Sequence, residues 1–223
     1  MSDTDSFIDE VTEEVRRDRM FLMMKRYGWI GAVVVVAIVA GAAYREYDRA
    51  QTSAAAESLG DAVIAALAEN ETDKRAEALA TIDAETPGGD AILKMLQAGA
   101  LANSDQGDAA VTLLAEISTN ADLPLIYRHI ATFKALGLQY DSLSAQDRRI
   151  QYETLAQPGA PLRLLAQEQL ALIDIADGDA EAAIARLQAI LEDAEVTADL
   201  QDRARQVIVA LGGTLDEPEI SQG

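Results

Sequence analysis

One uncharged run of 18 residues, from Tyr27 to Tyr44, constrains this chain more than any other feature. As a helix rising 1.5 Å per residue, the run spans about 27 Å, close to the roughly 30 Å hydrocarbon core of a bilayer. Tyr27 and Trp29 lie near one end, and Tyr44 and Tyr47 near the other. Aromatic rings favour the headgroup boundary. We therefore predict a transmembrane helix over residues 27–44, with these four aromatic residues at the membrane interface.

Other interpretations of this run stay open. A buried core helix fits less well, because a domain of this length seldom encloses a helix that has no polar face. A cleaved signal peptide would use the small-residue pattern at residues 40–42, but the 26 residues before the run carry seven acidic side chains, unlike a short basic leader. A membrane helix with Gly28, Gly31 and Gly41 could also pack closely against a second copy, which would make the protein a homodimer.

The basic residues beside the run predict its orientation. Five of them precede it and two, Arg45 and Arg49, follow it. Because positive charge is retained on the cytoplasmic side, we expect residues 1–26 in the cytoplasm. That segment has apolar residues at helical spacing, so a short amphipathic helix and a disordered tail are both open interpretations. Residues 45–223 would then lie on the opposite side of a membrane that the chain crosses once, in the periplasm if the cell is a Gram-negative bacterium.

Composition narrows the function classes. The formal net charge is −20, which argues against binding to nucleic acid, since that affinity depends on basic side chains. Cysteine is absent, and this excludes disulfides, thiolate metal sites and cysteine nucleophiles. His129 is the one histidine, so a catalytic triad or a two-histidine metal site has little to draw on.

Beyond the run, the pattern is helical throughout. No segment alternates polar and apolar residues with period two, so we predict no sheet. The helix that crosses the membrane meets no strong breaker before Asn70 and is expected to continue outward as a stalk. Short apolar-striped segments follow, separated by turn signals such as Pro87-Gly88-Gly89, which we interpret as a helix stop. Residues 144–147 have the composition of a helix N-cap.

Two of these segments suggest a repeat. Gly107-Asp108 and Gly178-Asp179 stand 71 residues apart, near twice the 34-residue tetratricopeptide period. Each pair follows a helix rich in small residues and precedes one with Ala and Leu at inward positions. We therefore predict an all-α chain in which a single transmembrane helix is followed by a degenerate tetratricopeptide-like α-solenoid over residues 45–213. Residues 214–223 are expected to form a flexible tail.

The chain also resembles a known family. The segments that carry the resemblance are FIDEVTEEVRRDRMFLMMKRYGWIGAVV, LPLIYRHIATFKAL and LAQPGAPLRLLAQEQLALIDIADGDAEAAIARLQAIL. They are similar to the ancillary SecYEG translocon subunit family of Gram-negative bacteria, in its alphaproteobacterial form. The resemblance implies an inner-membrane protein with a periplasmic solenoid. It further implies partners among the Sec translocon, periplasmic chaperones and exported client proteins. An adaptor for cell-envelope assembly or cell division, using the same scaffold, is the alternative.

The chain offers few candidate site residues. A basic cluster could bind an acidic partner or be simply solvated, and both interpretations stay open; its members are Arg128, Lys134, Arg148, Arg149 and Arg163. Acidic pairs such as Asp177 with Asp179 have the composition of ordinary helix caps, and no twelve-residue calcium loop occurs. No phosphate- or dinucleotide-binding glycine pattern is present. We predict no catalytic residue, cofactor or metal, and a protein-binding scaffold in place of an enzyme.

Overall fold

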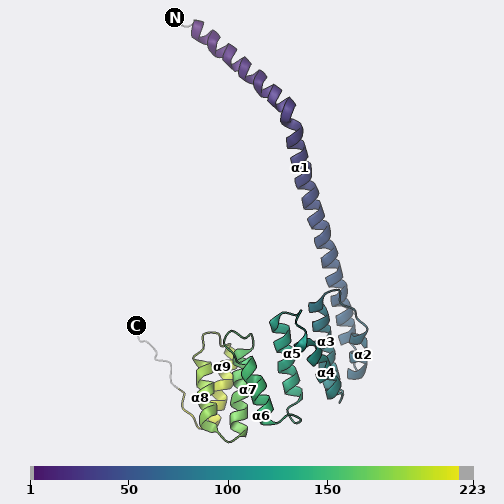
Figure 1. Ribbon diagram of the computed structural model, residues 1–223, viewed down its shortest axis with the longest axis vertical. Coiled ribbons are helices and arrows are strands. Elements are labelled where there is room, and N and C mark those ends of the chain that lie inside the picture. The colour runs from purple at the N-terminus through teal and green to yellow at the C-terminus, as the bar shows by residue number, and fades with distance from the viewer. Residues whose placement is uncertain (1–2, 216–223) are drawn as a thin grey trace. The chain divides into compact units, whose positions relative to one another are not determined.

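The computed structural model describes residues 3–215, with side chains described from residue 24 onward except at Tyr27 and Gly28. Every regular element among these residues is a helix, which confirms the all-α prediction (Figure 1). The chain divides into two compact units, Met1–Gly60 and Asp61–Gly223. The helices are α1 (Asp3–Leu67), α2 (Thr72–Ala80), α3 (Pro87–Ala102), α4 (Gly107–Thr119), α5 (Leu125–Leu138), α6 (Ala145–Leu155), α7 (Arg163–Ala176), α8 (Ala180–Leu191) and α9 (Ala198–Ala210).

The first unit consists of most of the long helix α1. Proline is absent from this 65-residue helix, and Gly60 is tolerated within it. The helix ends at Leu67, three residues before Asn70, so the predicted continuation beyond residue 44 is confirmed. The helical backbone also includes the predicted cytoplasmic segment from Asp3 onward, while the side chains of that segment lie outside the described residues.

The second unit is a series of short helices joined by connections of three to seven residues, a helical repeat-like arrangement (Figure 1). Side-chain caps define several of the helix starts. The predicted cap at Ser144 accepts a hydrogen bond from the Asp147 N–H at 3.1 Å. Asp179 and Thr197 cap α8 and α9 in the same way. Such caps satisfy backbone donors that lack partners in the first turn of a helix.

The Pro87-Gly88-Gly89 segment differs from its prediction. It does not stop a helix: α2 has already ended at Ala80, and Pro87 is the first residue of α3. Thr86 supplies the N-cap by accepting a hydrogen bond from the Gly89 N–H at 3.1 Å. Proline suits this position because its missing N–H would have no helical partner there.

The two Gly-Asp pairs also differ from each other. Gly178 adopts a φ of +83° in the turn between α7 and α8, a conformation that favours glycine. Gly107 is instead the first residue of α4, and Asp105 takes the positive φ of 59° in that turn. The repeat is therefore preserved at the level of helix pairs but not in the geometry of its turns.

Two apolar clusters hold the later helices together. The first joins α5, α6 and α7 through large buried side chains, among them Leu136, Tyr152 and Leu170. The second joins α7, α8 and α9 around Leu187, Ile190 and Ile208. Alanines with no exposed surface at helix crossings, such as Ala166 and Ala183, let these helices approach closely. Of the predicted tail, residues 216–223 lie outside the described part of the chain.

Candidate partner-binding surfaces

The apolar run of α1 is open along its length. The branched side chains between Val33 and Val39 each expose at least half of their surface, as do the aromatic rings of Trp29, Tyr44 and Tyr47. The Tyr27 side chain lies outside the described residues. Within the described chain one segment, Trp29–Leu67, is long and apolar enough to cross a membrane, and none of its apolar stretch is buried. A continuous exposed apolar surface of this kind favours contact with lipid or with another apolar surface.

Two members of the basic cluster are engaged inside the fold. Arg149 on α6 donates to Asp174 at 2.6 Å and to Asp177 at 2.9 Å. Arg163, at the start of α7, donates to both carboxylate oxygens of Asp193 after α8. The bond to Asp174 is the main cause of the raised pKa of Arg149, and Arg163 in turn lowers the pKa of Asp193. Neither guanidinium group is a free cation for a partner.

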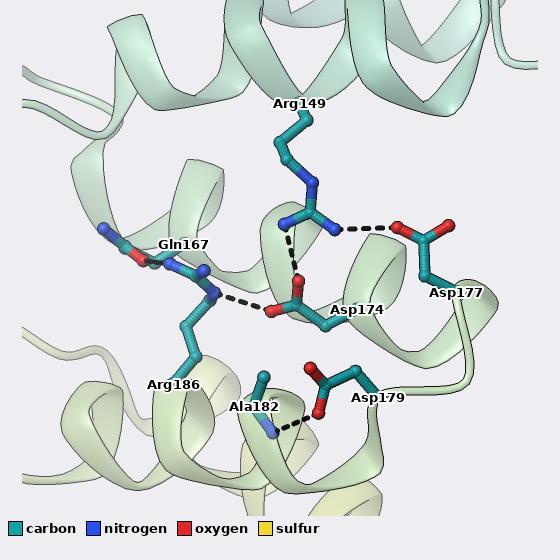
Figure 2. A network of polar contacts seen from close by, with 7 residues as sticks. All are labelled: Arg149, Gln167, Asp174, Asp177, Asp179, Ala182 and Arg186. Carbon is teal, nitrogen blue, oxygen red and sulfur yellow. Dashed lines mark hydrogen bonds and ion pairs between the residues drawn. The ribbon is translucent and has the colours of Figure 1, made fainter.

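Asp174 is the centre of the larger network (Figure 2). Its carboxylate is almost fully buried, with 5% of the side chain exposed, and accepts from Arg149 on α6 and from Arg186 on α8. Arg186 also donates to Gln167 on α7 at 2.6 Å. A buried carboxylate needs such partners, because desolvation of an unpaired charge is costly. The network therefore joins three helices through one side chain of α7.

Arg148 is buried and Arg128 is half-buried. Arg148 is 8% exposed, and its guanidinium group stacks 4.0 Å from the centre of the Tyr140 ring. The Nε atoms of Arg148 and Arg128 are buried and have no hydrogen-bond partner within the described residues. Stacking on an aromatic face suits the weakly hydrated guanidinium plane.

Lys134 is the member of the basic cluster that remains exposed and forms no ion pair among the described residues. It lies at the rim of a cavity of about 280 Å³ between α3 and α5, which we call the α3/α5 groove. Small residues form the walls, namely Ala98, Gly99 and Ala102 on α3 and Gly137 on α5, while Leu114 on α4 lies beneath them. Large apolar side chains that are more than a third exposed occur on the same two helices, at Ile92, Ile126 and Leu138.

A second cavity, of about 500 Å³, lies between α7 and α8. Alanines of α8 line it together with Arg163, Gln167 and Arg186. The hydrogen bonds already described engage all three of these polar side chains within the protein. The larger cavity therefore presents no charged group that lacks an internal partner, in contrast to Lys134 beside the α3/α5 groove.

His129 lies on α5, and its Nδ1 atom is buried without a partner in the described structure. Burial is the main cause of its lowered pKa, to which the charge of Arg128 adds. The imidazole is therefore neutral at pH 7. No group of three or more His, Asp or Glu side chains within the described residues could hold a metal ion.

Sequence reasoning could name the basic cluster but could not decide which of its members are free. The signal that it missed is the pairing of small residues on α3 and α5, because the two helices are separated by α4 in sequence and meet only in the fold. Comparison with models of protein families, with characterised proteins and with solved structures finds no match for this chain.

Proposed function

We propose that the protein is a membrane-tethered scaffold that binds other proteins, and that it assists the Sec translocon and periplasmic chaperones with exported proteins. The scaffold proposal depends on two features that occur together. An apolar helix without any buried stretch and a set of helical hairpins with exposed apolar side chains occur in the same chain. The partner classes come from the sequence resemblance described above.

The tether supports this role on physical grounds. A binding module confined to a membrane has a raised effective concentration beside other membrane proteins, without any additional contact. The segment after the run carries 31 acidic and 13 basic residues, a net charge of −18. Anionic lipid headgroups repel such a domain, so it would stand off the bilayer and stay available to partners.

The proposed orientation places residues 1–26 in the cytoplasm and residues 45–223 in the periplasm. A protease added to intact spheroplasts should then degrade the C-terminal part and spare an N-terminal epitope tag. Alkaline carbonate should leave the full chain in the membrane pellet. Release of the chain by carbonate would contradict the membrane anchor, and protection of the C-terminal part would contradict the orientation.

The partner proposal is tested by copurification in mild detergent. The full-length protein is compared with a shortened chain that lacks residues 1–44, and bound proteins are identified by mass spectrometry. We expect translocon subunits with the full-length protein only, because the first 44 residues would make the contact in the membrane. Recovery of cell-wall synthesis or division proteins, without translocon subunits, would favour the alternative adaptor function and leave the membrane anchor unaffected.

A further inference from the structure

Four of the eight residues that line the α3/α5 groove are alanine or glycine, and two of these, Gly99 and Gly137, have no side chain. A Cβ atom added at Gly99 or Gly137 would have no heavy atom within 4 Å, apart from neighbouring backbone of its own helix. No positive φ accounts for glycine at either position, and glycine inside a helix costs about 1 kcal/mol relative to alanine. Conformation therefore does not explain these two glycines, whereas an open surface between the helices does.

The charge pattern along α5 indicates the chemistry of an occupant. Ile130, Lys134 and Leu138 are spaced four residues apart, so they follow one another along the same side of the helix. Lys134 is exposed and forms no ion pair within the described structure. Apolar side chains thus lie on both sides of an available ammonium group.

From these features we propose that the α3/α5 groove binds a segment of a partner protein whose apolar side chains enter the groove and whose internal Asp or Glu pairs with Lys134. This inference rests on the proposed scaffold function and specifies its binding surface. The carboxylate belongs to an internal residue, because the apolar surface continues past Lys134 in both directions and the bound segment would continue with it. A chain terminus would leave one side of that surface uncovered.

The size and the charge of the site favour this occupant over others. The volume of about 280 Å³ falls just below the roughly 300–1,000 Å³ typical of small-molecule sites and is enough for side chains of a peptide. A single cation offers little to nucleic acid, whose affinity grows with the number of phosphates contacted. A second copy of this chain would bring another Lys134 and the same large negative charge, which disfavours self-association through this surface.

The test uses the full-length protein in mild detergent and fluorescent designed peptides of about 15 residues. Each peptide has leucines four residues apart and one central position that is Glu, Gln or Lys. We expect the Glu peptide to bind the wild-type protein about tenfold more tightly than the Lys peptide, as measured by fluorescence anisotropy. The Lys134→Glu variant should reverse this order. Lys74→Glu, the same charge change on α2 outside the groove, should not.

A second variant fills the groove without removing any contact. Gly137→Leu places a side chain in open space and should abolish binding of the Glu peptide. Ala185→Leu is the matched control, since it adds a similar bulk to the α7/α8 cavity and should leave binding unchanged. Thermal unfolding monitored by circular dichroism shows whether each variant remains folded.

Two results would overturn the proposed groove site. One is the absence of binding of any of the three peptides to the wild-type protein. The other is binding that neither Lys134→Glu nor Gly137→Leu reduces. The scaffold proposal is decided separately by the copurification experiment, because recovery of partners with the full-length protein does not depend on which surface binds them.

Discussion

The helices α2–α5 and the helices α6–α9 are built from similar residues but are held together differently. Among the described residues of α2–α5, the ion pair that joins two helices is Lys94 with Glu116. In α6–α9, ion pairs centred on Asp174, Asp193 and Glu168 link the elements at three places, and the pair of Glu168 joins α7 to α9. The first group instead has the α3/α5 groove, whose small wall residues are two alanines and a glycine of α3 and Gly137 of α5.

The same helical architecture can therefore be stabilised by ion pairs in one part and keep an open surface for binding in another. Ion pairs between helices fix their spacing and engage the polar groups that a partner would need. Where such links are absent and small residues line the helices, apolar surface remains available for binding. We therefore expect substitutions in α6–α9 to act mainly on stability, and substitutions in the α3/α5 groove to act mainly on binding. The following predictions run from the largest expected effect on stability to the smallest.

Asp174→Ala should have the largest effect. It removes the shared acceptor of Arg149 and Arg186 and leaves two partly buried cations without that partner. Breaking a buried pair on one side typically lowers stability by 3–5 kcal/mol, and partial exposure of both arginines favours a value of about 3 kcal/mol here. Urea unfolding of residues 61–223, followed by circular dichroism, measures the change.

Asp177→Ala is the matched control for Asp174→Ala. It removes the second acceptor of Arg149, but the Asp177 side chain is 50% exposed. Exposed ion pairs contribute about 0–1 kcal/mol, so this variant should unfold close to the wild type. Equal losses from the two variants would contradict the view that burial of Asp174 gives the network its importance.

Gly213→Ala should cause the second-largest loss of stability. An added Cβ atom would lie 2.8 Å from Cγ2 of Ile208 and 3.2 Å from Cδ1 of Ile184. Overpacking of this kind costs about 1–3 kcal/mol, since close-packed neighbours must shift. The same urea titration should show a lower unfolding midpoint with an unchanged slope, and a midpoint equal to that of the wild type would show that the surrounding side chains yield easily.

Gly137→Ala should act in the opposite direction. The position is helical and open, so the substitution reduces the entropy lost on folding without a clash. We expect an increase in the free energy of unfolding of about 0.5–1 kcal/mol. A decrease would mean that the groove wall at Gly137 is closed in solution.

The contrast between these two glycines also marks the limit of sequence reasoning. The all-α class, the end of the long helix before Asn70 and the cap at Ser144 were predictable, because periodicity, caps and turn residues act over a few neighbouring positions. Pro87 was misread as a helix stop, since proline marks either boundary and only the position of Thr86 decides between them. Neighbouring residues do not show that an added Cβ atom would have open space at Gly137 and would meet a packed side chain at Gly213.

The candidate site was predictable only in part, for a related reason. The basic cluster is visible in sequence, but the partners of Arg149 and Arg163 lie 25–32 residues further along the chain. Lys134 could not be singled out before these long-range pairs were known. Long-range contacts therefore decide which charged side chains form ion pairs within the fold and which remain available to a partner.

The smallest expected effect concerns the pH dependence of α5. Burial lowers the pKa of His129, so the folded protein takes up this proton at a lower pH than the unfolded chain, whose value is about 6.5. Between the two pKa values the unfolded chain binds more protons, and the free energy of unfolding therefore falls as the pH falls through that window.

His129→Phe keeps an aromatic ring at this position but cannot be protonated. Urea titrations of residues 61–223 at pH 7 and pH 5 should show a smaller loss of stability for the variant than for the wild type. An equal loss would assign the pH dependence to other groups and would mean that water reaches the His129 ring in the folded protein.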